Sequence, residues 1–369
     1  RTVNSQYLWD KITNAAWQSA DPGVHYKDII NDWHTIPEAG PIRTSNPCSE
    51  YMSIDDTGCN LASLNVMKFY NPKTKNFDID TYIDTCRRWT KILEISVFMA
   101  QLPSRKIAEN TAKYRQLGLG FANVGALAMM LGLPYDSDKA RTAIGLLISI
   151  MTATAYNESA LMARDLGPFY QYHEKNSRMI EVIFNHAKAA GNFTNEPYKG
   201  VSVKPVELSK SVSDTLPSGL GRLYEISRKA WNEAYENGKK HGYRNSQVTA
   251  IAPTGTIGLA MDCDTTGIEP DYAIIKYKSL AGGGSMMIVN SSVQPALENL
   301  GYGENAIAEI MEYIQKNNGI DDCEAIKEEH LAVFDCASPA RADGRAIDWS
   351  GHIKMLAATQ PFVSGSTSK

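Results

Sequence analysis

Two stretches of this chain lead from an apolar segment into a glycine-containing turn. "KYRQLGLGFANVGALAMMLG" (113–132) predicts a short strand or turn followed by a helix, and "YRNSQVTAIAPTGTIG" (243–258) predicts a strand that ends in a glycine-rich turn. Helix-forming sequences surround both stretches. Alternation of helices with short strands is typical of α/β folds, and no internal repeat points to another architecture.

The predicted helices are marked by apolar residues at helical spacing. The longest begins at Ser137, a suitable N-cap, and ends at Gly167. Others cover 5–20, 77–101 and 223–242, and short strands are expected within 272–277 and 286–290. Residues 31–51 read as loop and extended chain because they contain three prolines, and 192–219 read as an ordered excursion rich in Pro, Ser and Gly.

The bulk composition excludes several classes of protein. The chain has 369 residues, of which 43% are hydrophobic and 21% charged, as in soluble globular proteins. A formal charge of −4 and the lack of a basic run argue against nucleic-acid binding. The longest apolar run is interrupted by small polar residues, which argues against a membrane span. Six dispersed cysteines fit a reducing compartment and predict a cytoplasmic location.

The stretch "SNPCSEYMSIDDTGCN" (45–60) contains the most unusual group of side chains. In an extended segment, side chains two residues apart share a face, so Asn46, Cys48 and Glu50 are expected on one side. Pro47 and Ser49 would then point away. Pro47 also makes a helix unfavourable here.

The chemistry of this segment does not favour a thiolate nucleophile. A neighbouring carboxylate raises the pKa of a thiol, and no histidine is near enough in sequence to act as its base. A protonated thiol beside a carboxylate and an amide suits hydrogen-atom transfer instead. On the local pattern alone, a buried structural cysteine in a polar strand is an equal alternative.

The segment "APTGTIG" (252–258) is a candidate anion site. Backbone amides that follow a strand, together with the hydroxyls of Thr254 and Thr256, can bind phosphate, more so if a helix starts at Ile257. A plain turn is the alternative. The stretch "GLGFANVGAL" lacks the spacing of a dinucleotide-binding fingerprint and reads as a tight strand–helix turn.

The remaining cysteines indicate structural roles, and no metal site is predicted. Cys86 falls in an amphipathic helix and is expected in the core. Cys263 lies between two aspartates, but three consecutive residues cannot all face one ion. Cys323 and Cys336 are too far apart in sequence for an ordinary zinc site.

Several of these motifs, in this order, resemble the class II, adenosylcobalamin-dependent ribonucleotide reductases. The resemblance rests on "SNPCSEYMSIDDTGCNLASLNV" and extends through "NDWHTIPEAG", "RQLGLGFANVGAL", "KKHGYRNSQVTAIAPTGTIGLAMDCDTTGIEPD", "KSLAGGG" and "KEEHLAVFDCASP". It covers nearly the whole chain. It implies part of a ten-stranded α/β barrel, with 1–369 as one partial catalytic domain and a central finger loop at about 44–60.

The resemblance also implies roles for individual residues. Cys48 would carry the thiyl radical, which abstracts the ribose 3′ hydrogen, and Glu50 would be the base for the 3′ hydroxyl. Asn46 would hydrogen-bond the sugar, and Cys59 would be one thiol of the redox pair that reduces the 2′ position. The substrate would be bound by Ser45, Asn46, Pro47, Cys48, Ser49 and Glu50, with its phosphates at Pro253, Thr254, Gly255, Thr256 and Ile257.

Relative to that family, portions before Arg1 and after the closing "SGSTSK" are expected to be missing. They include the disulfide partner of Cys59 and the cysteine pair that receives electrons from a thioredoxin-like reductant. The leading prediction is a reductase of ribonucleotides, diphosphates rather than triphosphates, that uses adenosylcobalamin to make deoxyribonucleotides for DNA synthesis. The alternatives are a non-catalytic fragment of a split reductase that completes the barrel with a partner chain, and a cysteine hydrolase using Cys48. A homodimer is a further possibility for the assembly.

Overall fold

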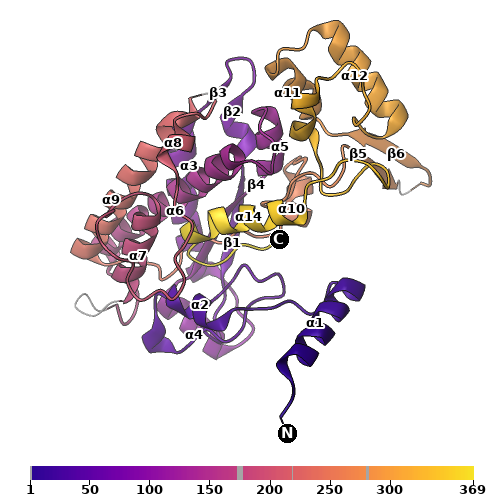
Figure 1. The fold of residues 1–369 in the computed structure, drawn as a ribbon. Coiled ribbons are helices and arrows are strands. Elements are labelled where there is room, and N and C mark those ends of the chain that lie inside the picture. Colours follow the sequence, from indigo (N-terminus) through magenta and orange to yellow (C-terminus); the bar gives the residue numbers. More distant parts are fainter. Residues whose placement is uncertain (1, 173–177, 218, 280–281) are drawn as a thin grey trace.

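A computed structural model describes residues 2–172, 178–217, 219–279 and 282–369 (Figure 1). Its strands are β1 (Asn60–Asn65), β2 (Tyr70–Asn71), β3 (Asn76–Phe77), β4 (Leu117–Ala122), β5 (Ile275–Ser279) and β6 (Ser285–Val289). Its α-helices are α1 (Ser5–Ser19), α2 (Lys27–Asp32), α3 (Ile79–Met99), α4 (Arg105–Tyr114), α5 (Val124–Met130), α6 (Asp138–Leu166), α7 (Arg178–Ala189), α8 (Lys210–Ser213), α9 (Leu223–His241), α10 (Gly255–Ala260), α11 (Val293–Asn299), α12 (Glu304–Asn317), α13 (Glu328–Leu331) and α14 (Trp349–Thr359).

Four extended segments lie side by side in parallel at the centre of the main body. Strand β1 pairs with β4 in parallel from Asn60 opposite Leu117 to Asn65 opposite Ala122. The segment 247–251 follows β4 through a parallel bridge between Leu119 and Thr249. The segment 365–368 follows in turn, through a bridge between Ile251 and Thr367. The extended segment predicted before the glycine-rich turn is therefore present. The closing "SGST" forms a further extended segment at the edge of this group, which the sequence did not indicate.

The approach of these segments depends on one glycine. A Cβ at Gly120 would collide with the backbone oxygen of Ala250, so a larger residue would push segment 247–251 off β4. Parallel neighbours also need long crossover connections, which the helices between them supply. The alternation of helices and strands predicted from the sequence is thus the α/β arrangement of the structure.

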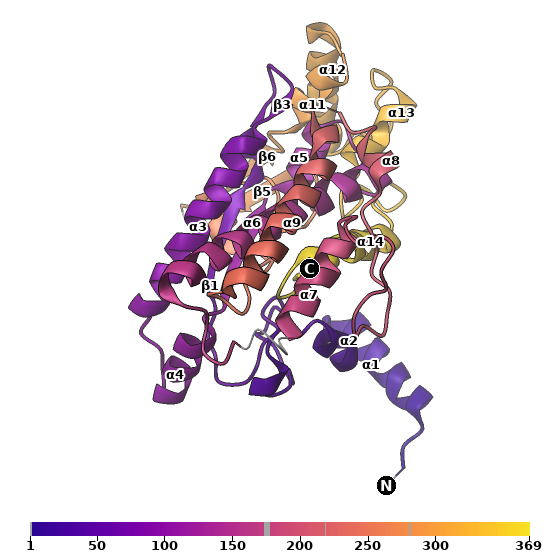
Figure 2. The ribbon, with the colours of Figure 1, turned by 90° about the vertical axis from the view of Figure 1, so that its left-hand side faces the viewer.

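Helices α3, α6 and α9 run side by side and cover the strands, with α7 beside α9 (Figure 2). Helix α6 is buried on nearly all sides, as expected for a helix in the middle of such a layer. The side chain of Ser137 accepts a hydrogen bond from the amide of Ala140, and the helix ends at Gly167, as predicted. The core between helices and strands contains Cys86, also as predicted.

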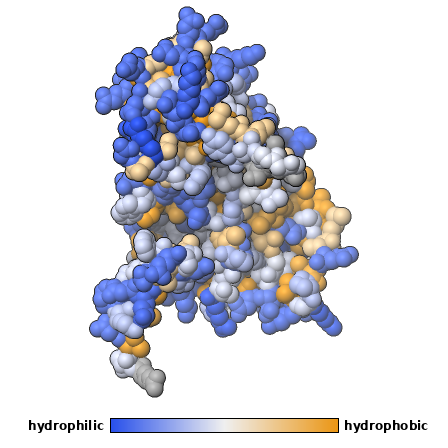
Figure 3. Space-filling model, turned by 90° about the vertical axis from the view of Figure 1, so that its right-hand side faces the viewer, coloured by the Kyte–Doolittle hydropathy of each residue, from blue (hydrophilic) through white to orange (hydrophobic). Residues whose placement is uncertain are grey.

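A second, smaller core forms the upper lobe in Figure 1. It joins apolar side chains of α11 and α12 with those of 320–336 and contacts the main body through Met129 of α5. The antiparallel hairpin of β5 and β6 extends from this lobe and accounts for the two strands predicted in 272–290. The space-filling view shows that the top of this lobe is largely hydrophilic (Figure 3).

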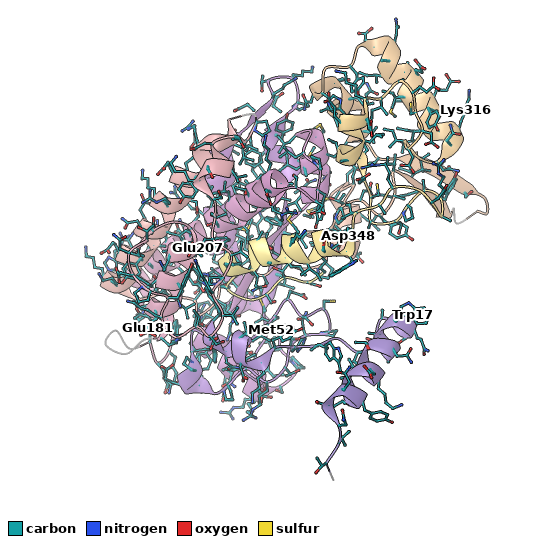
Figure 4. All side chains as sticks on the ribbon, in the orientation of Figure 1. Trp17, Met52, Glu181, Glu207, Lys316 and Asp348 are labelled. Atoms are coloured by element: carbon teal, nitrogen blue, oxygen red, sulfur yellow. The ribbon has the colours of Figure 1, made fainter. Side chains whose placement is uncertain are left out.

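Helix α1 stands apart from the main body (Figures 1 and 3). None of its residues is buried, and Trp17 is 84% exposed. In Figure 4, Trp17 is labelled on α1, whereas Met52 lies in the main body. Within the described part of the chain, no helix combines the length and apolar character needed to cross a bilayer.

Candidate active site

Residues 45–52 form a tight loop rather than the extended segment on which the shared face of Asn46, Cys48 and Glu50 was predicted. Ser45 and Met52 form an antiparallel bridge, and between them the amide of Ser49 donates to the oxygen of Asn46 at 3.0 Å. Ser49 has φ +68°, in the left-handed region that non-glycine residues seldom adopt. The amide of Tyr51 donates to Oδ1 of Asn46 at 2.9 Å and closes the loop. The side chain of Asn46 therefore supports the turn, which alternation along a strand could not predict.

Because the chain turns here, Cys48 and Glu50 do not share one face as predicted. Cys48 is exposed beside Pro47, whereas Glu50 is only 3% exposed. Oε2 of Glu50 is buried and has no hydrogen-bond partner within the described part of the chain. A buried carboxylate oxygen that lacks a partner is costly and marks a place where a ligand hydroxyl or water could bind.

Cys59, directly before β1, lies near Glu50. Its thiol is free, and its pKa is raised first by burial and then by the negative charge of Glu50. Both effects keep the sulfur protonated. A Cβ placed on Gly118 would be 2.9 Å from Sγ of Cys59, so glycine makes room for this thiol. The structure thus brings together Glu50 and Cys59, the predicted base and the predicted reductant.

Two further side chains that take part in the contacts of the loop, Tyr51 and His25, were not predicted. The hydroxyl of Tyr51 donates to Oγ1 of Thr57 at 2.8 Å, and burial together with the nearby Cys59 raises the pKa of Tyr51. Nε2 of His25 lies 2.9 Å from Oγ of Ser49 and 3.4 Å from Oγ of Ser45. His25 comes from the helix-breaking segment before α2, and nothing in its local sequence indicates this contact.

The predicted phosphate turn follows segment 247–251 directly. Pro253 is partly buried, and Thr254 follows in the left-handed conformation at φ 53°. Helix α10 begins at Gly255, two residues earlier than the start considered for an anion site. Gly255, Thr256 and Ile257 are exposed at its first turn, where backbone amides have no partners within the helix. The hydroxyl of Thr254 points inward instead and accepts the amide of Gly267 at 2.6 Å. Of the two threonine hydroxyls expected to bind an anion, only that of Thr256 is exposed.

The loop and the turn are linked through the C-terminal strand segment. The amide of Ser366 donates to the oxygen of Glu50 at 2.8 Å, and the amide of Ile251 donates to the oxygen of Ser366 at 3.0 Å. Neighbouring strands lie about 4.8 Å apart, so Glu50 is within two strand spacings of the residues that lead into the turn. Two motifs about 200 residues apart in sequence therefore border one region of the molecule.

Two of the other cysteines lie away from this region, whereas the amide of Cys263 donates to the oxygen of Gly258, at the end of the phosphate turn, at 2.9 Å. Cys323 and Cys336 are buried in the core of the upper lobe. Cys263 is half-buried, and its neighbour Asp264 accepts hydrogen bonds from Ser291 and Ser292. Across residues 2–172, 178–217, 219–279 and 282–369, no cluster of three or more His, Cys, Asp or Glu side chains could hold a metal ion.

Known proteins resemble this chain along its full length. The profile of the family described as "Ribonucleotide reductase, barrel domain" matches residues 1–369. A "Vitamin B12-dependent ribonucleotide reductase" of Agrobacterium fabrum is 42% identical and is aligned over 100% of this chain and 36% of its own length. A "Vitamin B12-dependent ribonucleoside-diphosphate reductase" of Thermoplasma acidophilum is 25% identical over 100% of this chain and 39% of its own.

A solved structure, the α subunit of the Actinobacillus ureae class Id ribonucleotide reductase, matches with a TM-score of 0.62 at 18% identity. The match covers 98% of this chain and 54% of that subunit, and at this identity it speaks for the fold alone. The prediction of a partial α/β barrel is confirmed by the profile and by this neighbour. This chain spans little more than a third of the two relatives named above. Since the profile of the barrel domain extends over every residue of the chain, the chain belongs to the ribonucleotide reductase family.

Proposed function

We propose that this chain is the catalytic core of an enzyme that reduces ribonucleotides to 2′-deoxyribonucleotides for DNA synthesis. The observation that carries the proposal is the grouping of an exposed cysteine, a buried carboxylate with an unpartnered oxygen and a protonated thiol around one loop. We treat 1–369 as one partial catalytic barrel domain, with a finger loop at about 44–60 and a phosphate turn at about 252–258. The relatives that match the whole chain are named reductases, which favours catalysis over a purely structural fragment.

In this proposal, Cys48 abstracts the 3′ hydrogen of the ribose as a thiyl radical. Oε2 of Glu50 accepts the proton of the 3′ hydroxyl, for which it is available because no described residue hydrogen-bonds to it. The Oδ1 atom of Asn46 is occupied by the amide of Tyr51, which leaves its Nδ2 group to donate to the sugar. The sugar-binding surface is completed by three other residues of the same loop, Ser45, Pro47 and Ser49.

Reduction at C2′ consumes two electrons. The C2′–O bond breaks and the hydroxyl leaves as water. Cys59 and a second thiol each give one electron and one proton. The two sulfur atoms then form a disulfide. We assign that second thiol to a part of the protein outside residues 1–369, where the relatives have most of their length. A thioredoxin-like dithiol would then reduce this disulfide, become oxidised itself and restore the two thiols.

The cofactor proposed is adenosylcobalamin, after the names of the relatives. The feature of this chain that fits it is Cys48, whose exposed side chain can be reached by a large cofactor. When bound, adenosylcobalamin supplies the radical that Cys48 receives. The chain's own part is to hold this thiol at the tip of the turn formed by 46–49.

The substrate proposed is a ribonucleoside diphosphate, in keeping with the name of the Thermoplasma relative. Its phosphates would bind at Pro253–Ile257, with the amides of Gly255, Thr256 and Ile257 as donors. Exposure of these three residues at the first turn of α10 supports this assignment. Helix N-termini favour anions because their amides and dipole point toward the ligand.

The test is product formation by the intact protein that contains this chain. It would be incubated with adenosylcobalamin, a dithiol and each ribonucleoside diphosphate or triphosphate, and deoxyribonucleotides would be quantified by mass spectrometry. We expect product from diphosphates. Absence of deoxyribonucleotide from every nucleotide, with the protein folded, would overturn the proposal.

A further inference from the structure

The arm of the loop that leaves Glu50 crosses the ends of three strand segments and is fastened to each. The oxygen of Glu50 accepts the amide of Ser366 at 2.8 Å. Two residues on, the oxygen of Met52 accepts Nε2 of Gln247 at 2.6 Å. Then Oγ of Ser53 accepts Nε2 of Gln116 at 3.0 Å. The arm 50–53 is thus held across segment 365–368, segment 247–251 and the start of β4.

The two glutamines form a matched pair. Gln116 is fully buried and directly precedes β4, and Gln247 is 4% exposed at the start of its segment. The amide of Leu117 donates to the oxygen of Gln247 at 2.9 Å, so the two residues lie on neighbouring strands. A buried carboxamide is costly unless its polar atoms are paired. The Nε2 group of each glutamine donates to the loop arm and not to a strand, while Oε1 of Gln116 has no partner among the described residues.

Fastening this arm fixes the place of Glu50. The carboxylate is two residues before Met52, and its backbone oxygen already faces Ser366. A Cβ at Gly365 would stand 2.9 Å from that same oxygen, which shows how little space separates the arm from the strand. Free movement of residues 52–53 would carry Glu50 away from Cys59.

We propose that Gln247 and Gln116 are positioning residues that clamp the loop arm 50–53 and thereby hold the Glu50 carboxylate beside Cys59. The role rests on the proposed function, since it concerns the placement of the base for the 3′ hydroxyl. Neither glutamine touches Cys48 or the phosphate turn among the hydrogen bonds of the described residues. Their loss should therefore affect the chemical step more than substrate binding.

The variants are Gln247→Met and Ser53→Ala. The first keeps the length of the side chain and removes its donor, and the second removes the acceptor of Gln116 from the loop side. The matched control is Asn185→Leu, because Asn185 is also a fully buried carboxamide that fastens a loop, through Lys199 N and O at 2.8 Å each. The control for Ser53→Ala is Ser213→Ala, because the hydroxyl of Ser213 is also buried and has no partner among the described residues.

Two readouts are needed, both on the intact protein. The first is the rate of Cys59 alkylation by iodoacetamide at pH 8, followed by mass spectrometry without cofactor or substrate. We expect an increase of about tenfold in both clamp variants, as for a thiol whose pKa falls by one unit. The second is steady-state kinetics. We expect kcat to fall about 10- to 100-fold with KM within about twofold, the scale of a 1 Å misplacement.

The outcomes separate the two proposals. Faster Cys59 alkylation in the clamp variants but not in the controls supports the clamp, even if the wild-type protein makes no deoxyribonucleotide. Alkylation and kcat equal to wild type in both variants would overturn it. So would equal changes in clamp and control variants, because a general loss of stability would then explain them. Should Gln247→Met fail to fold, Ser53→Ala alone decides by the same two measurements.

Discussion

The thiol of Cys59 lies against the backbone of Gly118, so close that a Cβ at position 118 would be 2.9 Å from Sγ. The same Cβ would collide with the side chain of Leu61. Position 118 is the second residue of β4 and is paired with Leu61 of β1 in the parallel ladder. A single methyl group at this position therefore tests whether the placement of the reducing thiol matters.

Gly118→Ala is expected to destabilise the fold by about 1–3 kcal/mol, the usual cost of overpacking a filled site. It should also displace Cys59 and lower turnover. Urea unfolding gives the first quantity and deoxyribonucleotide formation the second. The control is Gly23→Ala, where an added Cβ meets nothing within 4 Å. Equal stability of Gly118→Ala and wild type would show that the strand pair is looser than described.

Glu50→Gln is expected to lower kcat by about 10²–10⁴, the usual contribution of a general base, because an amide cannot accept the proton. The side chain keeps its size, so circular dichroism should be unchanged. Glu158→Gln is the matched control: Glu158 is also buried, but it pairs with Lys91 at 3.1 Å in another part of the molecule. A Glu50→Gln variant with wild-type kcat would remove Glu50 from the mechanism.

Glu94 supports the fold through two arginines. Its Oε1 accepts Nε of Arg115 at 2.7 Å and Nε of Arg244 at 2.9 Å, and its Oε2 accepts Nδ2 of Asn245 at 2.6 Å. Glu94→Gln leaves these guanidinium groups without a buried counter-charge, and we expect a loss of about 3–5 kcal/mol. Unfolding by the denaturant guanidinium chloride would measure this loss of free energy of unfolding. In contrast, Glu109→Gln, which breaks an exposed pair with Arg105, should leave the unfolding midpoint in place.

His186 makes stability depend on pH. Its Nδ1–H donates to the oxygen of Pro361 at 2.6 Å, and its buried Nε2 has no partner among the residues that the structure describes. Burial lowers the pKa of His186 from 6.5 to about 4. The unfolded chain therefore binds a proton more readily than the folded one between these values. Neutral His186 therefore contributes to the free energy of unfolding. This contribution is fully present above pH 6.5 and is lost as the pH falls toward 4, by up to about 3 kcal/mol.

His186→Gln should flatten that part of the pH profile. Unfolding free energies of wild type and variant would be compared from pH 7.5 to pH 4, and their difference should shrink as the pH falls. A constant difference across the range would mean that the ring of His186 is not titrating in this environment.

Helices and the α/β pattern could be predicted from local signals. The cap at Ser137, the stop at Gly167 and the apolar spacing of α6 and α9 are all encoded within a few residues of where they act. The side chains at Asn46–Glu50 were singled out from the sequence, but the extended course assumed for them, with Asn46, Cys48 and Glu50 on one face, is wrong. The turn there depends on the contacts of Asn46 with Tyr51 and of Glu50 with Ser366.

The proximity of Glu50 to Cys59 and to the turn at 252–258 could not be predicted from the local sequence. It comes from the order of four parallel segments, the last of which is the "SGST" stretch near the end of the chain. Nor could the sequence show that Thr254 turns its hydroxyl inward to Gly267. Such contacts are set by packing between distant segments, which hydrophobic periodicity does not report.

The most direct test of the account is electron paramagnetic resonance of the intact protein, frozen shortly after mixing with adenosylcobalamin and a ribonucleoside diphosphate, beside its Cys48→Ala variant. The account predicts a signal with sulfur-centred radical character in the wild-type protein and its loss in the variant, while circular dichroism of the two is the same. A signal of equal intensity in the variant, or deoxyribonucleotide formation by it at the wild-type rate, would contradict the role given to Cys48.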